Sequence, residues 1–319
     1  MPVLRKTAQN QRIGVYTPFI KKVVRNRTLL LMVLIPLAYI IIFSYLPMGG
    51  VILAFKDYKY RLGIFGSPWI GLKNFSFFFI SGAAGRVVRN TMLYNIAFIT
   101  IGMIVEVFFA IILSEIRGRY YKKVTQSMML LPFFISWVVV ASVLYSILSF
   151  EYGLLNNIIK GVGGEPVNLY AIPAAWPFVL VFLRMWKAVG YGSIIYLANI
   201  TSIDPQIYEA AEIDGANLWQ KTGYITIQHL RPTMVIMLLL AMGGMFRGDF
   251  GMFYQTIRNN GLLLPYTDII DTFVFRALLS SSDVGMSAAS GLFQSVLCFI
   301  TVMLANFVVN KIDPEYALF

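Results

Sequence analysis

Six long apolar stretches constrain this chain more than any other feature of its sequence. They cover about 29–55, 91–113, 128–148, 174–200, 233–246 and 286–309. A helix needs about 20 apolar residues to cross the hydrocarbon core of a bilayer, and each stretch, taken with its flanks, fits that length. Inside a membrane the backbone must be hydrogen-bonded within the protein, so such stretches form helices. The sequence therefore predicts an all-α polytopic membrane protein with six transmembrane helices.

The composition argues against a soluble alternative. The chain is 58% hydrophobic and 13% charged, whereas soluble domains are about 25% charged. A soluble fold of this size would have to cover its surface with polar groups. Cys298 is the single cysteine and His229 the single histidine, which excludes a disulfide framework, a cysteine-based metal site and histidine-rich metal or triad chemistry.

The basic residues predict the orientation. The net charge of +11 comes mostly from short segments beside the apolar stretches, a pattern of membrane topology rather than of nucleic-acid binding. The first 28 residues carry seven basic side chains, and the link after the second stretch carries four. The positive-inside rule places both segments, and with them both termini, in the cytoplasm. The basic segment 56–90 is the exception that this orientation places outside.

The chain divides into a basic N-terminal segment, 1–28, and a six-span domain, 29–319. Apolar and basic side chains alternate between Gln11 and Arg27, which indicates an amphipathic helix on the inner membrane surface; the alternative is a disordered basic tail. The first apolar stretch is too long for the core of a secretory signal, so we expect it to be retained.

Three long connections are expected on the outer side, at about 56–90, 149–173 and 247–285. Long ordered loops in compact proteins tend to be functional. These three are therefore candidates for a docking surface outside the membrane, on which Asn157 and Asn260 are the positions chosen for probing.

The link between the fourth and fifth stretches, 202–232, is the most informative part of the chain. Asp204 suits an N-cap and Pro205 the first helical position. Glu209 lies early in the helix, where a carboxylate is favoured, and Gly215 can end the helix in a left-handed cap. The spacing predicts a short, slim cytoplasmic helix that fits a groove on a partner.

This loop resembles the EAA signature of permease subunits in binding-protein-dependent ABC importers. The signature reads Glu-Ala-Ala, three residues, then Gly. The resemblance implies that the residues engaging an ATPase are Glu209, Ala210, Ala211, Asp214 and Gly215. The family continues with Ile-x-Leu-Pro, where this chain has Gln228 in place of the proline, so the bend at that point is in question.

Further segments resemble the polysaccharide and complex-sugar branch of the same permeases. They are SPWIGLKNF, NTM, GLLNNII, WKAVGYGSIIYLANI and DIIDTFVFR, beginning at residues 67, 90, 153, 186 and 268. The resemblance implies a type I ABC importer permease fold in the cytoplasmic membrane of a bacterium. It also implies a second, homologous but different permease, two ATPase subunits, and an extracellular sugar-binding lipoprotein. ATP and Mg would be used by the ATPases, with no cofactor bound by this chain.

The sequence holds no catalytic motif. It has no G-x-x-x-x-G-K-[ST], G-x-S-x-G or H-E-x-x-H pattern. The energy for transport must therefore come from partners or from an ion gradient. An ion-gradient-driven secondary transporter or channel is the alternative, although such proteins often contain internal repeats and none is convincing here.

Three ionisable residues lie inside the apolar stretches: Glu106, Arg184 and Lys187. Charges in a bilayer are costly and usually face a cavity or a partner. Arg184 and Lys187 are three residues apart and share a helix face. Lys187 stands too deep to reach an interface, so we expect it to face a hydrated pathway, with Arg184 extending the same face; a structural pair that holds helices together is the alternative.

Aromatic and polar side chains complete the set of pathway candidates. Sugar sites combine aromatic surfaces with hydrogen-bonding groups, whereas aromatics near membrane interfaces are often anchors. The candidates are Trp176, Trp186, Tyr191, Phe246 and Asp249.

Overall fold

The computed structural model describes residues 26–80, 82, 84–116, 118–281 and 283–317. Nearly all of the predicted amphipathic segment 1–28 lies outside these residues. The described part of the chain is helical, with one isolated bridge between Lys56 and Trp69 and no strand. The predicted all-α class is confirmed.

Five helices among the described residues are long and apolar enough to cross a membrane, and a bent pair brings the number to six if it forms one span. This agrees with the predicted count. The five are Arg27–Phe55, Ala84–Glu115, Pro173–Ile200, Leu218–Met242 and Val284–Ile312.

The chain separates into two compact units, Met1–Ile52 and Leu53–Phe319. The described part of the first unit is almost entirely one helical rod, whose α-helical segment α2 (Arg27–Ile40) contains Pro36. It continues through a π turn, Ile41–Tyr45, and the short α3 (Leu46–Met48) into a 3₁₀ turn, Gly49–Phe55.

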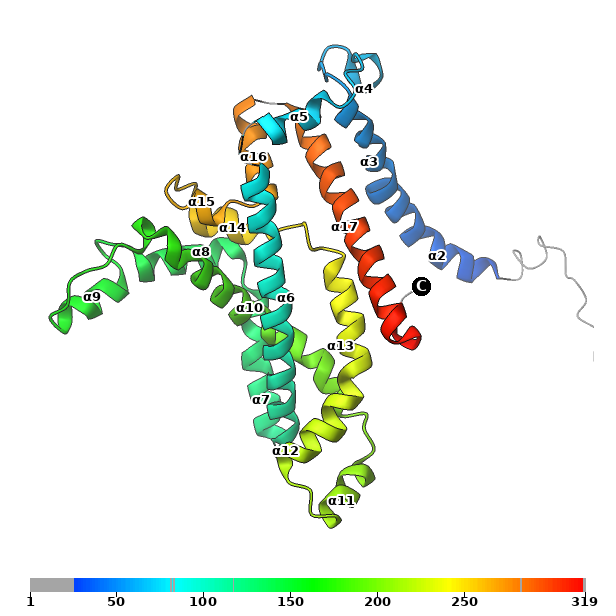
Figure 1. The fold of residues 1–319 in the computed structure, drawn as a ribbon, viewed down its shortest axis with the longest axis vertical. Helices are drawn as coiled ribbons and strands as arrows, with labels where there is room; N and C mark the ends of the chain where they lie inside the picture. The colour runs from blue at the N-terminus through cyan, green and yellow to red at the C-terminus, as the bar shows by residue number, and fades with distance from the viewer. Residues whose placement is uncertain (1–25, 81, 83, 117, 282, 318–319) are drawn as a thin grey trace, which may run out of the picture. The chain divides into compact units, whose positions relative to one another are not determined.

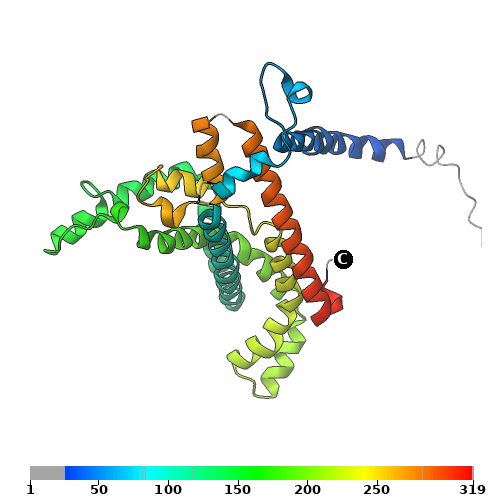
Figure 2. The same cartoon turned by 45° about the horizontal axis from the view of Figure 1, so that its top comes forward.

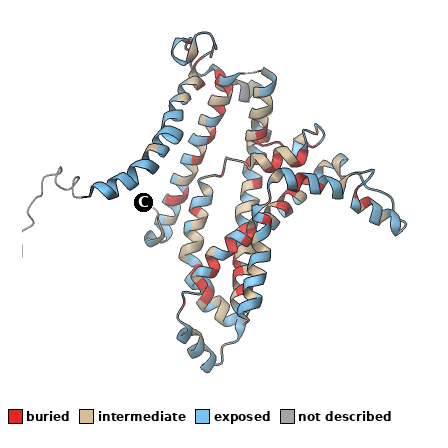
Figure 3. Ribbon diagram, turned by 180° about the vertical axis from the view of Figure 1, so that it is seen from behind, coloured by how far each residue is buried: buried red, intermediate tan, exposed pale blue. Residues whose placement is uncertain are grey.

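The second unit is built around two long helices, α6 (Ala84–Glu115) and α10 (Trp176–Ile200), which pack along each other. Figure 3 shows how the buried positions gather along the elements that pack together. One core cluster joins these helices to α8 (Trp137–Leu148) and α14 (Phe250–Ile257), and a second joins them to α13 (Ile227–Met242).

Short helices fill the connections. Figure 1 shows α5 and α16 at one end of this unit and α11 at the other, and Figure 2 keeps them apart in the same way. The short helices are α4 (Gly63–Gly66), α5 (Lys73–Ile80), α9 (Leu154–Gly161), α11 (Pro205–Ile213), α12 (Leu218–Lys221), α15 (Leu264–Thr267) and α16 (Ile270–Ser281). The last long helix is α17 (Val284–Ile312), and 3₁₀ turns lie at Leu169–Ala171, Pro173–Ala175 and Pro314–Tyr316.

The third apolar stretch is not one straight helix. The segments Arg119–Phe134 and Trp137–Leu148 meet at an angle of 95°. The α-helix α7 (Arg119–Leu130) is followed by a 3₁₀ turn, Leu131–Phe134, that contains Pro132. Ser136 then adopts an extended conformation and starts α8 by accepting a hydrogen bond from the amide of Val139. The prediction of a single helix over 128–148 is therefore wrong at this break.

The fifth apolar helix also differs from its predicted range, 233–246, since it runs over Leu218–Met242. Asn217 starts it with a capping box, in which the Asn217 side chain accepts from the amide of Gln220 and the Gln220 side chain accepts from the amide of Asn217. The helix ends before Gly243. Hydropathy alone missed its start because the first turns are polar.

Gly190 lets α10 touch the backbone of the broken span. A Cβ added at Gly190 would lie 1.8 Å from the carbonyl oxygen of Met129 and 2.9 Å from the amide nitrogen of Leu130. Backbone atoms cannot move aside as a flexible side chain can. Glycine is therefore required for the contact between α10 and the end of α7.

We expect Gly190→Ala to lower the thermal stability of the purified protein strongly. The added methyl group forces the two helices apart, and overpacking of this kind costs about 1–3 kcal/mol or more. The matched control is Gly161→Ala, where an added Cβ meets nothing within 4 Å. The measurement is the melting temperature of both variants in detergent, and equal values would contradict the requirement for glycine.

Candidate functional site

Lys187 hydrogen-bonds to the backbone at the break in the third span. Its ammonium donates to the carbonyl oxygens of Pro132 at 3.2 Å and Phe133 at 2.7 Å, and also to that of Ile135. The carbonyl of Pro132 also accepts from the amide of Ile135 at 3.2 Å, whereas the carbonyls of Phe133 and Ile135 lie where the helical hydrogen-bond pattern is interrupted and need an outside donor. The same ammonium lies 5.4 Å from the centre of the Trp137 ring. The sequence had suggested a hydrated pathway for Lys187, and the structure places its amine against backbone.

Asp249 connects three elements. Its Oδ2 accepts from the Arg184 guanidinium at 3.1 Å and from the Trp137 indole at 3.0 Å, and its Oδ1 accepts from the amide of Met252 at 3.1 Å. The last contact makes Asp249 the N-cap of α14. One carboxylate therefore holds α10, α8 and α14 together beside the break.

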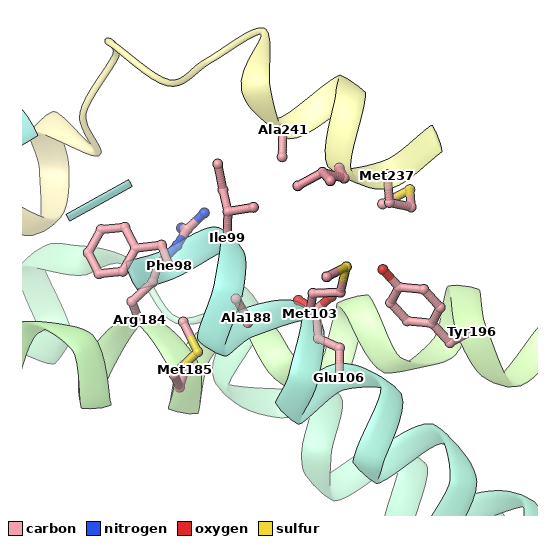
Figure 4. A pocket seen from close by; sticks show the side chains of 12 residues that line it. Phe98, Ile99, Met103, Glu106, Arg184, Met185, Ala188, Tyr196, Met237 and Ala241 are labelled. Atoms are coloured by element: carbon pink, nitrogen blue, oxygen red, sulfur yellow. The ribbon is translucent and has the colours of Figure 1, made fainter. Parts of the chain in front are cut away.

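Glu106 and Arg184 line a cavity of about 190 Å³ between α6, α10 and α13. Figure 4 shows both side chains at this cavity, with the ring of Tyr196 at one end. The volume suffices for several water molecules. The other lining residues are Phe98, Ile99, Gly102, Met103, Met185, Ala188, Met237, Leu238 and Ala241.

Gly192 makes room for the Glu106 carboxyl group. A Cβ at position 192 would lie 2.1 Å from the Cδ and 2.2 Å from the Oε1 of Glu106. Gly190 and Gly192 thus serve two different contacts of one helix. Sequence reasoning singled out neither glycine; the available signal was the presence of glycine inside an apolar stretch, since small residues let helices approach closely.

The structure separates the other pathway candidates. Tyr191 stacks on Phe133 with ring centres 4.6 Å apart. Trp186 lines an apolar groove of about 700 Å³ between α8 and α10, away from the charged cavity. Trp176 is fully buried in the core and donates to the carbonyl of Leu169, a structural position. The carbonyl of Phe246 accepts from Gln294.

The predicted helix in the link between the fourth and fifth spans is present as α11, Pro205–Ile213. Asp204 caps its start by accepting from the amide of Gln206 at 3.0 Å. Gly215 follows its end in a left-handed conformation with φ of +79°, and the amide of Ala216 returns to the carbonyl of Ala211 at 2.9 Å. The capping chemistry thus behaves as predicted.

The surface of α11 is available to a partner. Glu209, Ala210 and Asp214 are exposed and Ala211 is half-buried. Ile213 nearby has 88% of its surface exposed, and Trp219 of α12 has 83%; large exposed apolar side chains close together are typical of interaction surfaces. Figure 1 shows α11 at the end of this unit opposite α5 and α16.

Gln228 does not bend the chain. It is exposed and lies in α13, which continues through it, and Pro232 stands inside the same helix. The irregularity lies earlier, in a π turn over Thr222–Thr226.

The DIIDTFVFR segment has internal contacts that hold the connection between α14 and α17. Asp268 is buried and pairs with Arg276 at 2.5 Å. Asp271 accepts from the amide of Gly248 at 2.7 Å and from Gln294 at 3.2 Å, and burial raises the pKa of the Asp271 carboxyl group above its ordinary value. These carboxylates fix the segment next to Asp249.

Comparison with known proteins identifies the class. Residues 106–314 match the family described as "Binding-protein-dependent transport system inner membrane component", and the chain belongs to this family. It is a membrane-spanning permease component with several spans, as the EAA resemblance predicted.

Relatives and solved structures agree along nearly the whole chain. It is 34% identical to the polygalacturonan/rhamnogalacturonan transport system permease protein YteP of Bacillus subtilis (strain 168), covering 97% of this chain and 99% of that protein. It is 32% identical to protein LplB of the same organism, covering 91% of each. A chain in the crystal structure of a bacterial alginate ABC transporter, in complex with an alginate pentasaccharide-bound periplasmic protein, matches with a TM-score of 0.82 and 28% identity over 92% of this chain and 98% of that one. The predicted type I permease fold is confirmed.

We expect Lys187→Met to lower the stability of the protein. The carbonyls of Phe133 and Ile135 lose the donor that Lys187 supplies. A buried group left unsatisfied costs about 1–3 kcal/mol, and the cost is smaller at Phe133, where the bond is exposed. The control is Lys160→Met, at an exposed position of α9. The melting temperature and transport are measured together: an unchanged melting temperature with impaired transport would instead support the pathway role for Lys187.

Gly192→Ala should destabilise the protein, and Glu106→Ala in the same chain should restore part of the loss. The added methyl group collides with the Glu106 carboxyl group, and removal of that group opens the space again. Gly291→Ala is the control, because an added Cβ there meets nothing within 4 Å. A double variant as unstable as the sum of the single variants would show that the two positions do not interact.

Proposed function

We propose that this chain is the permease subunit of an ATP-driven importer that moves an oligosaccharide or polysaccharide across the cytoplasmic membrane. The observation that carries the proposal is α11, a helix capped at both ends that presents Glu209 and Ala210 at one end of a family fold. The names of the relatives support the substrate class, since one is a polygalacturonan/rhamnogalacturonan permease and a matched structure is an alginate transporter.

The assembly that we propose contains four further subunits. A chain with one EAA helix engages one ATPase, so a second, homologous permease would engage the other and the two permeases would form a heterodimer. An extracellular sugar-binding lipoprotein would deliver the substrate to the outer connections, with both termini of this chain in the cytoplasm. Membrane lipid is the remaining contact, and nucleic acid has no part.

This chain would carry no chemistry of its own. ATP and Mg would be bound by the partner ATPases, since the sequence lacks a phosphate-binding loop. The substrate pathway would pass the cavity between α6, α10 and α13, which Glu106 and Arg184 line, with Asp249 fixing the arginine. Tyr191 and Trp186 lie on the same helix but outside the lining of this cavity, and would contribute aromatic surface elsewhere along the pathway. Lys187 would hold the break beside them.

The test is reversal of the charge on the coupling helix. Glu209→Lys should abolish ATP-driven uptake while the protein still inserts, because Glu209 is expected to approach a basic residue of the ATPase. Glu115→Lys, at an exposed position at the end of α6, is the control and should transport normally.

Copurification from the native membrane accompanies this measurement. The purified complex should contain a P-loop ATPase and a second, different permease in equal amount to this chain. Normal uptake by Glu209→Lys would contradict the coupling role, and uptake driven by an ion gradient in the absence of ATP would favour a secondary transporter. An active complex containing only this chain as the permease would overturn the heterodimer.

A further inference from the structure

Two side-chain contacts connect α11 to the start of the fifth span. The hydroxyl groups of Tyr208 and Thr226 lie 2.8 Å apart and form a hydrogen bond. The ammonium of Lys221 pairs with the carboxylate of Glu212 at 2.5 Å. Tyr208 and Glu212 belong to α11, whereas Lys221 and Thr226 belong to the helical run that begins at Leu218.

By its backbone, α11 is joined to both spans: residues 201–204 connect it to α10, and residues 214–217 connect it to α12, the start of the fifth span. The chain leaves α10 through single turns, in which the amide of Thr201 donates to the carbonyl of Leu197 and the amide of Ile203 to that of Ile200. The side-chain contacts of Tyr208 and Glu212 add a second connection to the helix that continues into α13.

Thr226 occupies a special place in that helix. It is buried, with 5% of its surface exposed, and it is the last residue of the π turn Thr222–Thr226. Single π turns inside α-helices interrupt the regular ladder of hydrogen bonds and are frequent at functional sites. The hydroxyl group of Thr226 is therefore held at the turn where the regular hydrogen-bond ladder of the fifth span is interrupted.

From Thr226 the helix leads directly to the cavity. Met237, Leu238 and Ala241 of α13 form one wall of it, and Met237 lies eleven residues beyond Thr226, about 16 Å along a helix that rises 1.5 Å per residue. The α-helix is continuous from Ile227 to Met242, with Pro232 inside it. A displacement of Thr226 thus reaches the wall that faces Glu106.

We infer that Tyr208 is a positioning residue that transfers movement of α11 to the fifth span through Thr226, with the Glu212–Lys221 pair as a second contact. The inference rests on the proposed function, in which an ATPase moves α11. It adds a route: the wall formed by α13 responds to ATP through the hydroxyl pair as well as through the backbone, whereas the wall formed by α10 responds through the backbone.

The test compares these two walls with a water-soluble, charged maleimide. Single cysteines are introduced at Ala241 of α13 and Ala188 of α10, two residues that line the same cavity, in a Cys298→Ser background. The complex with its ATPases is reconstituted in nanodiscs, and the labelling rate of each cysteine is measured without nucleotide and with Mg-ATP and vanadate. Tyr208→Phe removes only the hydroxyl, and Thr226→Val replaces the threonine hydroxyl by a methyl group.

In both variants we expect the ATP-dependent change in the labelling rate of the cysteine at position 241 to fall about five-fold. This factor corresponds to one hydrogen bond of ordinary net strength. The change at position 188 should persist. The double variant should be no worse than either single one, because both remove the same bond. Thr226→Ser keeps a hydroxyl and should restore the response, and Tyr224→Phe, at an exposed tyrosine of the same turn, should match the unmodified protein.

Melting temperature and the amount of copurified ATPase are recorded for every variant. An unchanged response at position 241 in Tyr208→Phe overturns the inference, and so does an equal fall at positions 241 and 188, which would indicate general loosening. Failure of the proposed function has a different signature, because the unmodified complex would then lack an ATPase or show no ATP-dependent change at either position.

Discussion

A break in a membrane span exposes backbone carbonyls in a place where water is scarce, and the arrangement of this permease depends on how that cost is met. The third span bends by 95° after Pro132, and the ammonium of Lys187 donates hydrogen bonds to three carbonyl oxygens around the bend. Every unsatisfied backbone group in hydrocarbon costs several kcal/mol. The lysine therefore fixes the fourth span against the third, and its depth in the membrane follows from the position of the break.

The fourth span, α10, meets this requirement because neighbouring residues of this one helix make different contacts. Lys187 reaches the break, Gly190 contacts the backbone of Met129, and Gly192 admits the carboxyl group of Glu106. Within six residues the helix satisfies a broken span on one side and forms a charged cavity on the other. Substitution of Gly190 would force two backbones apart, whereas substitution of Gly192 would displace the Glu106 carboxyl group from its place at the cavity.

The sequence predicted those parts of the molecule that local chemistry decides. Apolar length located the spans, and the capping residues Asp204 and Gly215 located α11 almost to the residue. The bend at Pro132 was not predicted, because hydropathy indicates the length of a span and not its direction. The early start of the fifth helix at Leu218 was not predicted either, because the capping box at Asn217 lies in a polar segment. Charges in the spans were recognised as costly, yet their partners were not: Trp137 and Gly192 join the site only through tertiary packing.

The coupling helix and the cavity are connected by the same two helices. The helix α10 enters the link that carries α11, and the run that ends as α13 leaves it, while both line the cavity at their far parts. Asn199 of α10 and Thr233 of α13 are hydrogen-bonded between these two points. This bond joins the two helices between the link and the cavity, so a shift of α13 along α10 has to strain it. The π turn at Thr222–Thr226 lies between this bond and α11. A push on α11 that deforms this turn would shift α13 along α10, and the side chain of Glu106 faces the space that such a shift changes.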